Sequence, residues 1–370
     1  MSYPKIMVVS PTAGLFGGTE RVLEVLLYQT AHSNDISYAF LEDGPLVNIA
    51  HSLNVPFRLI ERSRTRNLKK TFAVVSELRK FIQSERPAVV FAWTDFAQLY
   101  ASPASIAIAK SLWWQRSNID GGAITRLCKC LPHSHAIANS KFTRDQMRQH
   151  RIKVADSPLY PPYDANKFTQ ENASKQNLRN EFGIPNSSFV IGSVGRMQHW
   201  KGFDTLVDSI RQVRKKHEDV FCVIVGGRHE LEPHYENLLQ ERIAQLGISE
   251  HVMLPGSQRN IADWMRTMDV FVHSADREPF GIVVPEAMAI GLPVIASIPG
   301  GPAEAIEPEV SGLLVSSNRV DDLTRAILRL KEDPALAYRL SKQARRRAIR
   351  FSSENFSDNL IATIAEGLQS

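Results

Sequence analysis

The stretch "FVIGSVGRMQHWKGF", residues 189–203, runs from a short apolar segment through a loop with two glycines and two cations into an amphipathic segment. Short runs rich in Val, Ile and Phe alternate with amphipathic stretches in the same way in both halves of the chain. Such alternation predicts βαβ units and parallel sheets. Because the series occurs twice, the predicted fold class is α/β, with two Rossmann-like, doubly wound parallel-sheet domains facing across a cleft.

A chain of 370 residues is too long for one ordinary core and suits two domains. The three prolines of "SPLYPPYDANKF" (157–168) interrupt the periodicity and mark the expected linker. We expect an N-terminal domain at 1–168, a C-terminal domain at 169–350, and a helix at 351–370 that packs back toward the N-terminal domain. The expected strands are 5–10, 37–41, 88–93, 111–115, 136–138, 189–195, 220–225, 251–254, 270–273, 292–296 and 312–315.

Composition and the chain start set the expected class and location. The chain has 43% hydrophobic and 22% charged residues, as folded proteins do, and its apolar runs are shorter than a bilayer span. The opening "MSYPKIMVVS" lacks the features of a signal peptide, so a cytoplasmic location is expected. Cys128, Cys130 and Cys222 do not complete a zinc pattern and are expected to be reduced thiols. We expect no metal, no cofactor and no nucleic-acid partner.

Positive charge is concentrated in the first half. Residues 1–168 carry 21 Lys and Arg against 13 Asp and Glu, a net charge of +8, whereas the remainder carries 23 against 26. The stretch "ERSRTRNLKK" (61–70) is its densest part, and it has two interpretations. It is either a solvated loop and helix face, or a patch for anionic lipid at the inner membrane face or for a phosphate-bearing acceptor. Its cations are Arg62, Arg64, Arg66, Lys69 and Lys70.

In each series, a glycine-containing loop follows the first strand. In "TAGLFGGTER" (12–21), Gly17 and Gly18 remove side chains where a helix begins, which favours either a tight turn or close approach to a phosphate or sugar. The loop has neither the dinucleotide fingerprint nor the ending of a P-loop. In "VGRMQHWKGF" (194–203), Arg196 and Lys201 either hold a diphosphate or belong to an ordinary surface.

The apolar stretch "EPFGIVVPEAMAIGLPVIA" (278–296) has a carboxylate on each side of a Gly-containing turn. Pro285 suits the first turn of a helix and Gly291 suits its end, so residues 285–290 predict a short helix. The backbone before it would offer amides toward the crevice at the strand ends. Glu278 and Glu286 are therefore candidate ligand-binding groups, with helix capping as the alternative.

Together these stretches resemble the retaining group 1 glycosyltransferases, family 4, which have the GT-B fold. Residues 278–296 look like that family's pair of glutamates eight positions apart, "GRMQHWKG" like its diphosphate-binding loop, and "GGTERV" like its N-domain glycine loop. "IANSKF" (137–142), "LPGSQRNI" (254–261) and "GGPAEAI" (300–306) also match, so the resemblance spans nearly the whole chain.

The resemblance implies specific donor-binding residues. Arg196 and Lys201 would hold the nucleotide diphosphate, Glu286 the ribose, and Glu278 the transferred sugar. Backbone amides of Phe280, Gly281, Ile282 and Val283 would contact sugar and phosphate, and the segment Gly256, Ser257, Gln258 and Arg259 would lie along the base. Gly17 and Gly18 would let the N-terminal domain reach the diphosphate.

Two N-terminal residues are open hypotheses. Many relatives have a histidine after the fifth N-domain strand, where "QRSN" here offers Arg116. Arg116 either contacts the sugar or acceptor, and so joins Glu278, Arg196 and Lys201 as a catalytic candidate, or simply pairs with an acid. Asp95 in "FAWTDFAQLY" is either an acceptor-side group or a helix N-cap.

The predicted activity is metal-independent transfer of a hexose, with retention, from a nucleotide diphosphate donor, UDP-linked by expectation. The acceptor would be a glycan or lipid-linked glycan in polysaccharide or cell-envelope synthesis, at the inner face of the plasma membrane if the basic half binds lipid. The alternatives are a nucleotide-sugar epimerase or phosphorylase on the same fold and a catalytically decayed nucleotide-sugar-binding scaffold.

Overall fold

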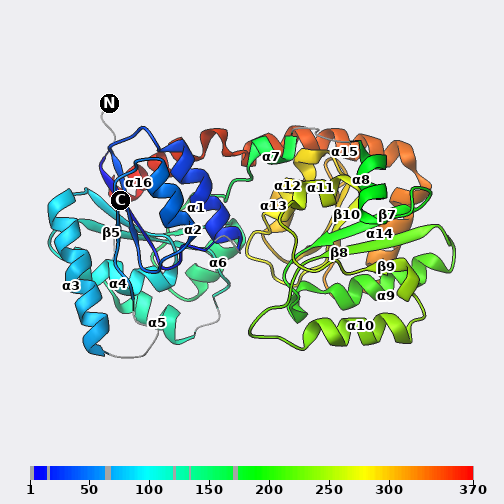
Figure 1. The fold of residues 1–370 in the computed structure, drawn as a ribbon, viewed down its shortest axis with the longest axis horizontal. Coiled ribbons are helices and arrows are strands. Elements are labelled where there is room, and N and C mark those ends of the chain that lie inside the picture. Colours follow the sequence, from blue (N-terminus) through cyan, green and yellow to red (C-terminus); the bar gives the residue numbers. More distant parts are fainter. Residues whose placement is uncertain are drawn as a thin grey trace. The chain divides into compact units, whose positions relative to one another are not determined.

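The computed structural model describes residues 4–14, 17–62, 68–119, 122–132, 135–169 and 174–369 (Figure 1). The chain forms two compact units, one of residues 1–162 and 353–370 and one of residues 163–352. The chain first passes from one unit to the other after Pro162, which lies within the expected linker but before the expected boundary at 168. Residues 163–169 belong to the second unit because the Tyr163 N–H donates to the Phe351 carbonyl (2.9 Å) and the helix that follows packs on α12 (Val283–Ile290).

Unit 1 has a six-stranded sheet in the order β3-β2-β1-β4-β5-β6, and every neighbouring pair of strands is parallel. Its central strands are buried along their whole length, as continuous apolar runs require when helices cover both faces. In Figure 1, α1, α2 and α16 lie on one side of this sheet and α3, α4 and α5 on the other. The strands are β1 (Ile6–Ser10), β2 (Ile36–Phe40), β3 (Phe57–Leu59), β4 (Val89–Ala92), β5 (Lys110–Gln115) and β6 (His135–Ala138).

The helices of unit 1 connect these strands, and the last one comes from the end of the chain. That helix docks because Phe356 stacks on Trp114, with ring centroids 5.8 Å apart, and Gln29 accepts a hydrogen bond from the Ser357 N–H (3.2 Å). The helices are α1 (Gly18–Gln29), α2 (Pro45–Ser52), α3 (Leu68–Glu85), α4 (Asp95–Ser105), α5 (Ala123–Cys130), α6 (Lys141–Gln149) and α16 (Phe356–Gln369).

Unit 2 repeats the same topology in the order β12-β11-β10-β7-β8-β9, again with parallel neighbours. Helices α9 and α10 lie on one side of its sheet, and α11 and α12 on the other (Figure 1). The two-sheet prediction is therefore confirmed. The strands are β7 (Phe189–Val194), β8 (Val220–Val225), β9 (Val252–Met253), β10 (Val270–His273), β11 (Val294–Ile298) and β12 (Leu313–Ser316).

The stretch 278–296 resolves as a loop, a helix and a strand. Helix α12 begins two residues earlier than predicted and ends at Gly291, whose φ of 91° suits glycine. Two helices, α14 and α15, precede the helix expected at 351–370, and they are separate because the Asp333 side chain caps α15 at Pro334. The helices and 3₁₀ turns of unit 2 are α7 (Ala165–Thr169), α8 (Lys175–Phe182), η1 (His199–Lys201), α9 (Phe203–Arg214), α10 (Tyr235–Gln245), η2 (Ser249–His251), α11 (Ile261–Arg266), α12, α13 (Pro302–Ala305), α14 (Val320–Glu332), α15 (Pro334–Ala348) and η3 (Ile349–Phe351), and η4 (Ser353–Asn355) precedes α16 in unit 1.

Within the described ranges, the structure has neither a membrane-spanning helix nor a disulfide. No helix in them is both long and apolar enough to cross a bilayer. The three cysteines are free, and Cys128 and Cys222 are buried in the cores of their units.

Candidate active site

The site in unit 2 arises from the point where the strand order reverses. Strands β7 and β10 are parallel neighbours, but the chain leaves them in opposite directions along the sheet, so the loops at their carboxyl ends diverge and leave room for a ligand. Lys201 follows β7, and Glu278 follows β10. Topology alone therefore brings a cation and a carboxylate to the same edge from residues 77 positions apart.

Lys201 and Glu278 form a hydrogen-bonded ion pair, with side chains only 13% and 12% exposed. The Lys201 ammonium also lies over the ring of Trp200, 4.1 Å from its centroid. His273 at the end of β10 places Nε2 3.5 Å from Oε2 of the same carboxylate. Burial alone would raise the pKa of Glu278, but the charge of Lys201 and the contact with His273 outweigh it and lower that pKa to about 2. The carboxylate is therefore ionised at neutral pH.

Backbone contacts lock the two loops together. Ser274 Oγ donates to the Lys201 carbonyl (3.0 Å), and the Asp276 N–H donates to the Trp200 carbonyl (2.8 Å). Gly202 has a φ of 66°, and a Cβ there would lie 2.3 Å from the Ser274 carbonyl oxygen. Only glycine permits this approach, so the Lys-Gly sequence sets the position of the cation.

The turn from Glu278 into α12 is also built on close packing. Gly281 has a φ of 73°, and a Cβ there would lie 3.1 Å from His273 Nε2. The Gly301 N–H donates to the Glu278 carbonyl (2.8 Å), which ties the downstream glycine loop to this turn. Residues 280–283 lie at the start of α12 as predicted, while Glu286 lies one turn further along and is 2% exposed. The two glutamates thus have different surroundings.

Arg196 does not join the Lys201 pair. It is exposed, and Nη1 lies 3.1 Å from Nε2 of His229 on the loop after β8. Burial and then the Arg196 charge lower the pKa of His229. The Lys201 side chain instead passes Gly195, where a Cβ would lie 3.5 Å from Lys201 Cδ. The structure therefore places the two predicted diphosphate ligands on one loop but in different directions.

The predicted base-binding segment follows β9 and packs on the loop after β8. The Gly226 N–H donates to the Gly256 carbonyl (3.0 Å), and the Gln258 side chain donates to the Pro255 carbonyl (2.8 Å). Ser257 and Arg259 are exposed. This segment lies at the carboxyl edge of the sheet, next to the Arg196 side of the site.

In unit 1, Gly17 is the N-cap residue of α1, and Gly18 is its first residue. Arg116, which follows β5, donates to the Gly18 and Thr19 carbonyls (3.2 Å each) and lies 4.3 Å above the Trp114 ring. No acid in the described part of the chain is within ion-pair distance of it, and the partners found there are backbone carbonyls and an aromatic ring. Burial lowers the pKa of Arg116 to about 9, with the Glu20 charge opposing, and the guanidinium stays charged at neutral pH.

Asp95 is not an N-cap. Thr94 holds that position, and its hydroxyl accepts the Ala97 N–H (3.2 Å), because the helix begins at Asp95, one residue earlier than the capping hypothesis for Asp95 required. Asp95 accepts the Phe96 N–H (2.8 Å) and a weak hydrogen bond from Ser117 (3.5 Å). It lies at the carboxyl end of β4, beside the point where the unit 1 sheet reverses.

The basic stretch 61–70 is partly described. Arg62 is engaged within its unit, since it pairs with Glu42 (3.0 Å) and lies 5.0 Å from the centre of the Phe96 ring. Lys69 and Lys70 are exposed at the start of α3. Arg64 and Arg66 lie outside the described residues.

Sequence reasoning missed His273. Its side chain is 3% exposed, and Nδ1 has no hydrogen-bond partner in the ranges that the structure describes. The signal was present in "VFVH", where one polar residue ends an otherwise apolar strand five positions before Glu278.

The fold is that of the GT-B glycosyltransferases. Solved structures with this fold cover the whole chain: Anabaena Alr3699/HepE in complex with UDP matches with a TM-score of 0.85 over 98% of this chain and 100% of that one, at 23% identity. A glycosyltransferase from Rickettsia africae matches with a TM-score of 0.83 over 100% of both, at 20% identity.

Residues 174–347 match the sequence model of the family "Glycosyl transferases group 1". The lipopolysaccharide core biosynthesis mannosyltransferase LpsB of Rhizobium meliloti is 30% identical over 222 residues, which cover 59% of this chain and 62% of that protein. A D-inositol 3-phosphate glycosyltransferase of Stackebrandtia nassauensis is 30% identical over 61% of this chain and 51% of its own length. The chain thus spans between half and two thirds of these relatives, and its second unit carries a group 1 glycosyltransferase domain, which confirms the resemblance seen in the motifs.

Proposed function

We propose that the protein is a retaining group 1 glycosyltransferase that moves a hexose from a UDP-linked donor to a glycan or lipid-linked glycan acceptor. The observation that carries the proposal is the nearly buried Lys201–Glu278 pair at the carboxyl edge of unit 2, beside the start of α12. The similarity to a sugar transferase of lipopolysaccharide synthesis and to a fold neighbour solved with UDP-glucose supports the substrate class.

In this proposal Glu278 accepts hydrogen bonds from the sugar hydroxyls, because its ionised carboxylate is a strong acceptor held at a fixed position. Lys201 and Arg196 neutralise the diphosphate, and the amides of residues 280–283 contact sugar and phosphate. Glu286 would bond the ribose, and residues 256–259 would flank the base. Within unit 1, Asp95 is proposed to serve the acceptor, and Arg116 braces the start of α1 at Gly17 and Gly18.

The proposed reaction does not require a metal ion. The bond between the anomeric carbon and the phosphate oxygen breaks, the acceptor oxygen forms the new bond on the same face, and the acceptor proton passes to the departing phosphate. Negative charge grows on the leaving diphosphate, and the Lys201 and Arg196 cations with the amides of residues 280–283 would stabilise it. We therefore propose a metal-independent reaction, carried out in the cytoplasm or at the inner membrane face.

A screen of nucleotide sugars by thermal shift tests the donor. A ligand that binds only the folded state raises the melting temperature, so one UDP-sugar should raise it more than free UDP does. Incubating that donor with candidate acceptors and reading the anomeric configuration by NMR then tests retention. If the donor sugar is inverted at a ring carbon without any acceptor, the protein is an epimerase. If the protein binds donors but releases no nucleotide with any acceptor, the scaffold alternative holds.

A further inference from the structure

Helix α15 presents an exposed basic face on the outside of unit 2. Its buried stripe, made of Leu336, Leu340, Ala344 and Ala348, packs into the core. The opposite face carries a shallow groove of roughly 470 Å³. The residues that line it follow helical spacing along α15 and into η3, namely Tyr338, Ser341, Lys342, Arg345, Arg346 and Ile349.

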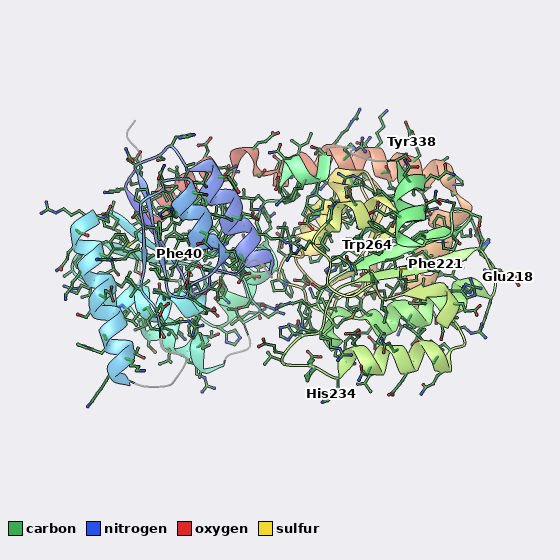
Figure 2. All side chains as sticks on the ribbon, viewed as in Figure 1. Phe40, Glu218, Phe221, His234, Trp264 and Tyr338 are labelled. Carbon is green, nitrogen blue, oxygen red and sulfur yellow. The ribbon has the colours of Figure 1, made fainter. Side chains whose placement is uncertain are left out.

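Two large apolar side chains flank this groove. Tyr338 is 71% exposed and Ile349 is 64% exposed, and Figure 2 shows Tyr338 at the outer surface of α15. The 11 positions between them correspond to about three turns and roughly 16 Å along the axis, so both point to the same side. Each of these side chains alone would be ordinary, but with cations between them they give one helix face an amphipathic character.

The positive charge of this stretch is only partly compensated, since Arg347 pairs with Glu307 (3.5 Å) and Arg339 donates to the Glu309 carbonyl (3.1 Å). Residues 334–350 contain six Lys and Arg and no Asp or Glu. Arg345 donates to the Ile290 carbonyl and Arg347 to the Ala305 carbonyl (2.6 Å each). Lys342, Arg346 and Arg350, in contrast, are exposed and form no hydrogen bond or ion pair within the described ranges.

The face is also rigid. Arg345 and Ser341 both bond the backbone at the C-terminus of α12, which leaves the α15 side chains on a fixed support rather than on a loop. Helix α12 is the helix that begins at the candidate donor site. The α15 face therefore lies on the same structural support as the site, at the far end of an eight-residue helix.

We propose that the α15 face docks on an anionic lipid bilayer. Unpaired cations between an aromatic and an aliphatic side chain fit phosphate headgroups and the acyl boundary beneath them, since Arg and Lys bind the phosphates while Tyr and Ile insert. A second copy packed on this face through a two-fold axis would bring cation against cation. Because the larger apolar stripe of α15 is buried in unit 2, binding is weak, reversible and dominated by charge.

Co-sedimentation of the full chain with vesicles tests this without any assay of activity. Vesicles of phosphatidylglycerol and phosphatidylcholine in equal parts should bind the protein, and pure phosphatidylcholine should not. Binding should fall as NaCl rises from about 50 mM to about 500 mM, because salt screens exposed charges. The double variant Lys342→Glu/Arg346→Glu should bind at least tenfold more weakly, since each cation contributes roughly fivefold. Tyr338→Ser should lower binding severalfold at unchanged charge.

Two controls separate this surface from general charge. Arg211→Glu/Lys215→Glu changes net charge equally at exposed positions of α9 and just beyond it, on the other side of the unit 2 sheet, and should bind as the unaltered protein does. Lys69→Glu/Lys70→Glu tests the N-terminal basic stretch. If the α15 variant binds normally while either control loses binding, the proposal is overturned. Binding to an acidic polypeptide but to neither vesicle would overturn it too.

Discussion

Each unit holds a cation at the carboxyl edge of its sheet, and the two cations have different kinds of partner. In unit 2, Lys201 pairs with Glu278 from the loop of the neighbouring strand, and both side chains are nearly buried. In unit 1, Arg116 gives its donors to the Gly18 and Thr19 carbonyls at the start of α1 and stacks on Trp114. One cation is matched by a charge, the other by backbone oxygens and an aromatic ring.

This difference shows what a charge at a strand end can do. A carboxylate held by a buried cation keeps acceptor sites directed at a ligand, and its loss leaves an unpaired charge behind. A guanidinium bonded to the carbonyls of a helix start braces that start and positions the Gly17–Gly18 turn. We therefore expect substitutions in the unit 2 pair to affect both stability and ligand binding, and substitution of Arg116 to affect mainly stability.

The largest effect is expected from Lys201→Met. It leaves Glu278 as a nearly buried, ionised group without its main partner, which should cost about 3–5 kcal/mol of unfolding free energy. The double variant Lys201→Met/Glu278→Gln removes both charges and should recover about 1 kcal/mol or more of the summed losses. Urea unfolding of the two single variants and the double variant measures this. Strict additivity would mean that the pair is not coupled.

The pH dependence of stability tests the same carboxylate. The pKa of Glu278 is lowered from 4.5 to about 2 in the folded protein, so its contribution is fully present above pH 4.5 and is lost as the pH falls toward 2. The size of the shift corresponds to roughly 3 kcal/mol. Unfolding free energies measured from pH 6 to pH 2 should therefore fall more steeply for the unaltered protein than for Glu278→Gln. Parallel curves would show that Glu278 is not held as the geometry implies.

A glycine pair isolates the contact between the two unit 2 loops. Gly202 and Gly183 both end a helical turn with a φ near 70°, but a Cβ at Gly183 meets nothing within 4 Å, whereas one at Gly202 would strike the Ser274 carbonyl. Gly183→Ala should cost about 1 kcal/mol from backbone strain alone. Gly202→Ala should cost about 2 kcal/mol more and should weaken donor binding. Equal losses of unfolding free energy for the two variants would show that the close approach of Gly202 to the Ser274 carbonyl does not contribute.

The smallest effect on ligand binding is expected in unit 1. Arg116→Leu removes two charge-assisted hydrogen bonds to carbonyls and the stacking on Trp114, which should lower the unfolding free energy by about 1–2 kcal/mol. The affinity for UDP should not change. Calorimetric titration of UDP, together with urea unfolding of the same variant, decides whether Arg116 supports the start of α1 or contacts a ligand. A large loss of affinity or turnover at near-normal stability would instead favour the hypothesis that Arg116 contacts the sugar or acceptor.

The sequence was sufficient for most of the fold because buried parallel strands are apolar runs of recognisable length. It also predicted the loop and helix within residues 278–296, since Pro285 and Gly291 fit only one order of elements. It could not show that Arg196 and Lys201 diverge, because the direction of a side chain depends on which neighbouring loop supplies a partner. The partners of Arg116 are backbone carbonyls, which have no sequence signature at all.

His273 illustrates the same limit. A single histidine at the end of a strand is an ordinary core residue until the adjacent carboxylate is located. Only the register of β10 and the turn at Gly281 bring its ring beside Glu278. Conversely, Thr94 and Asp95 compete for one capping position in the sequence, and the observed start of α4 assigns it to Thr94.

The central claim is that Glu278 binds the donor sugar while Lys201 serves the diphosphate. Calorimetric titration of Glu278→Gln with UDP and with the UDP-sugar selected by thermal shift tests it most directly. We predict that UDP binds the variant at least as tightly as the unaltered protein, because Lys201 is released from its partner. The additional affinity that the sugar provides should disappear, and the rate of transfer should fall by about 100-fold or more. A variant that binds the UDP-sugar and turns it over normally, or that loses UDP and UDP-sugar affinity in equal measure, would contradict the account.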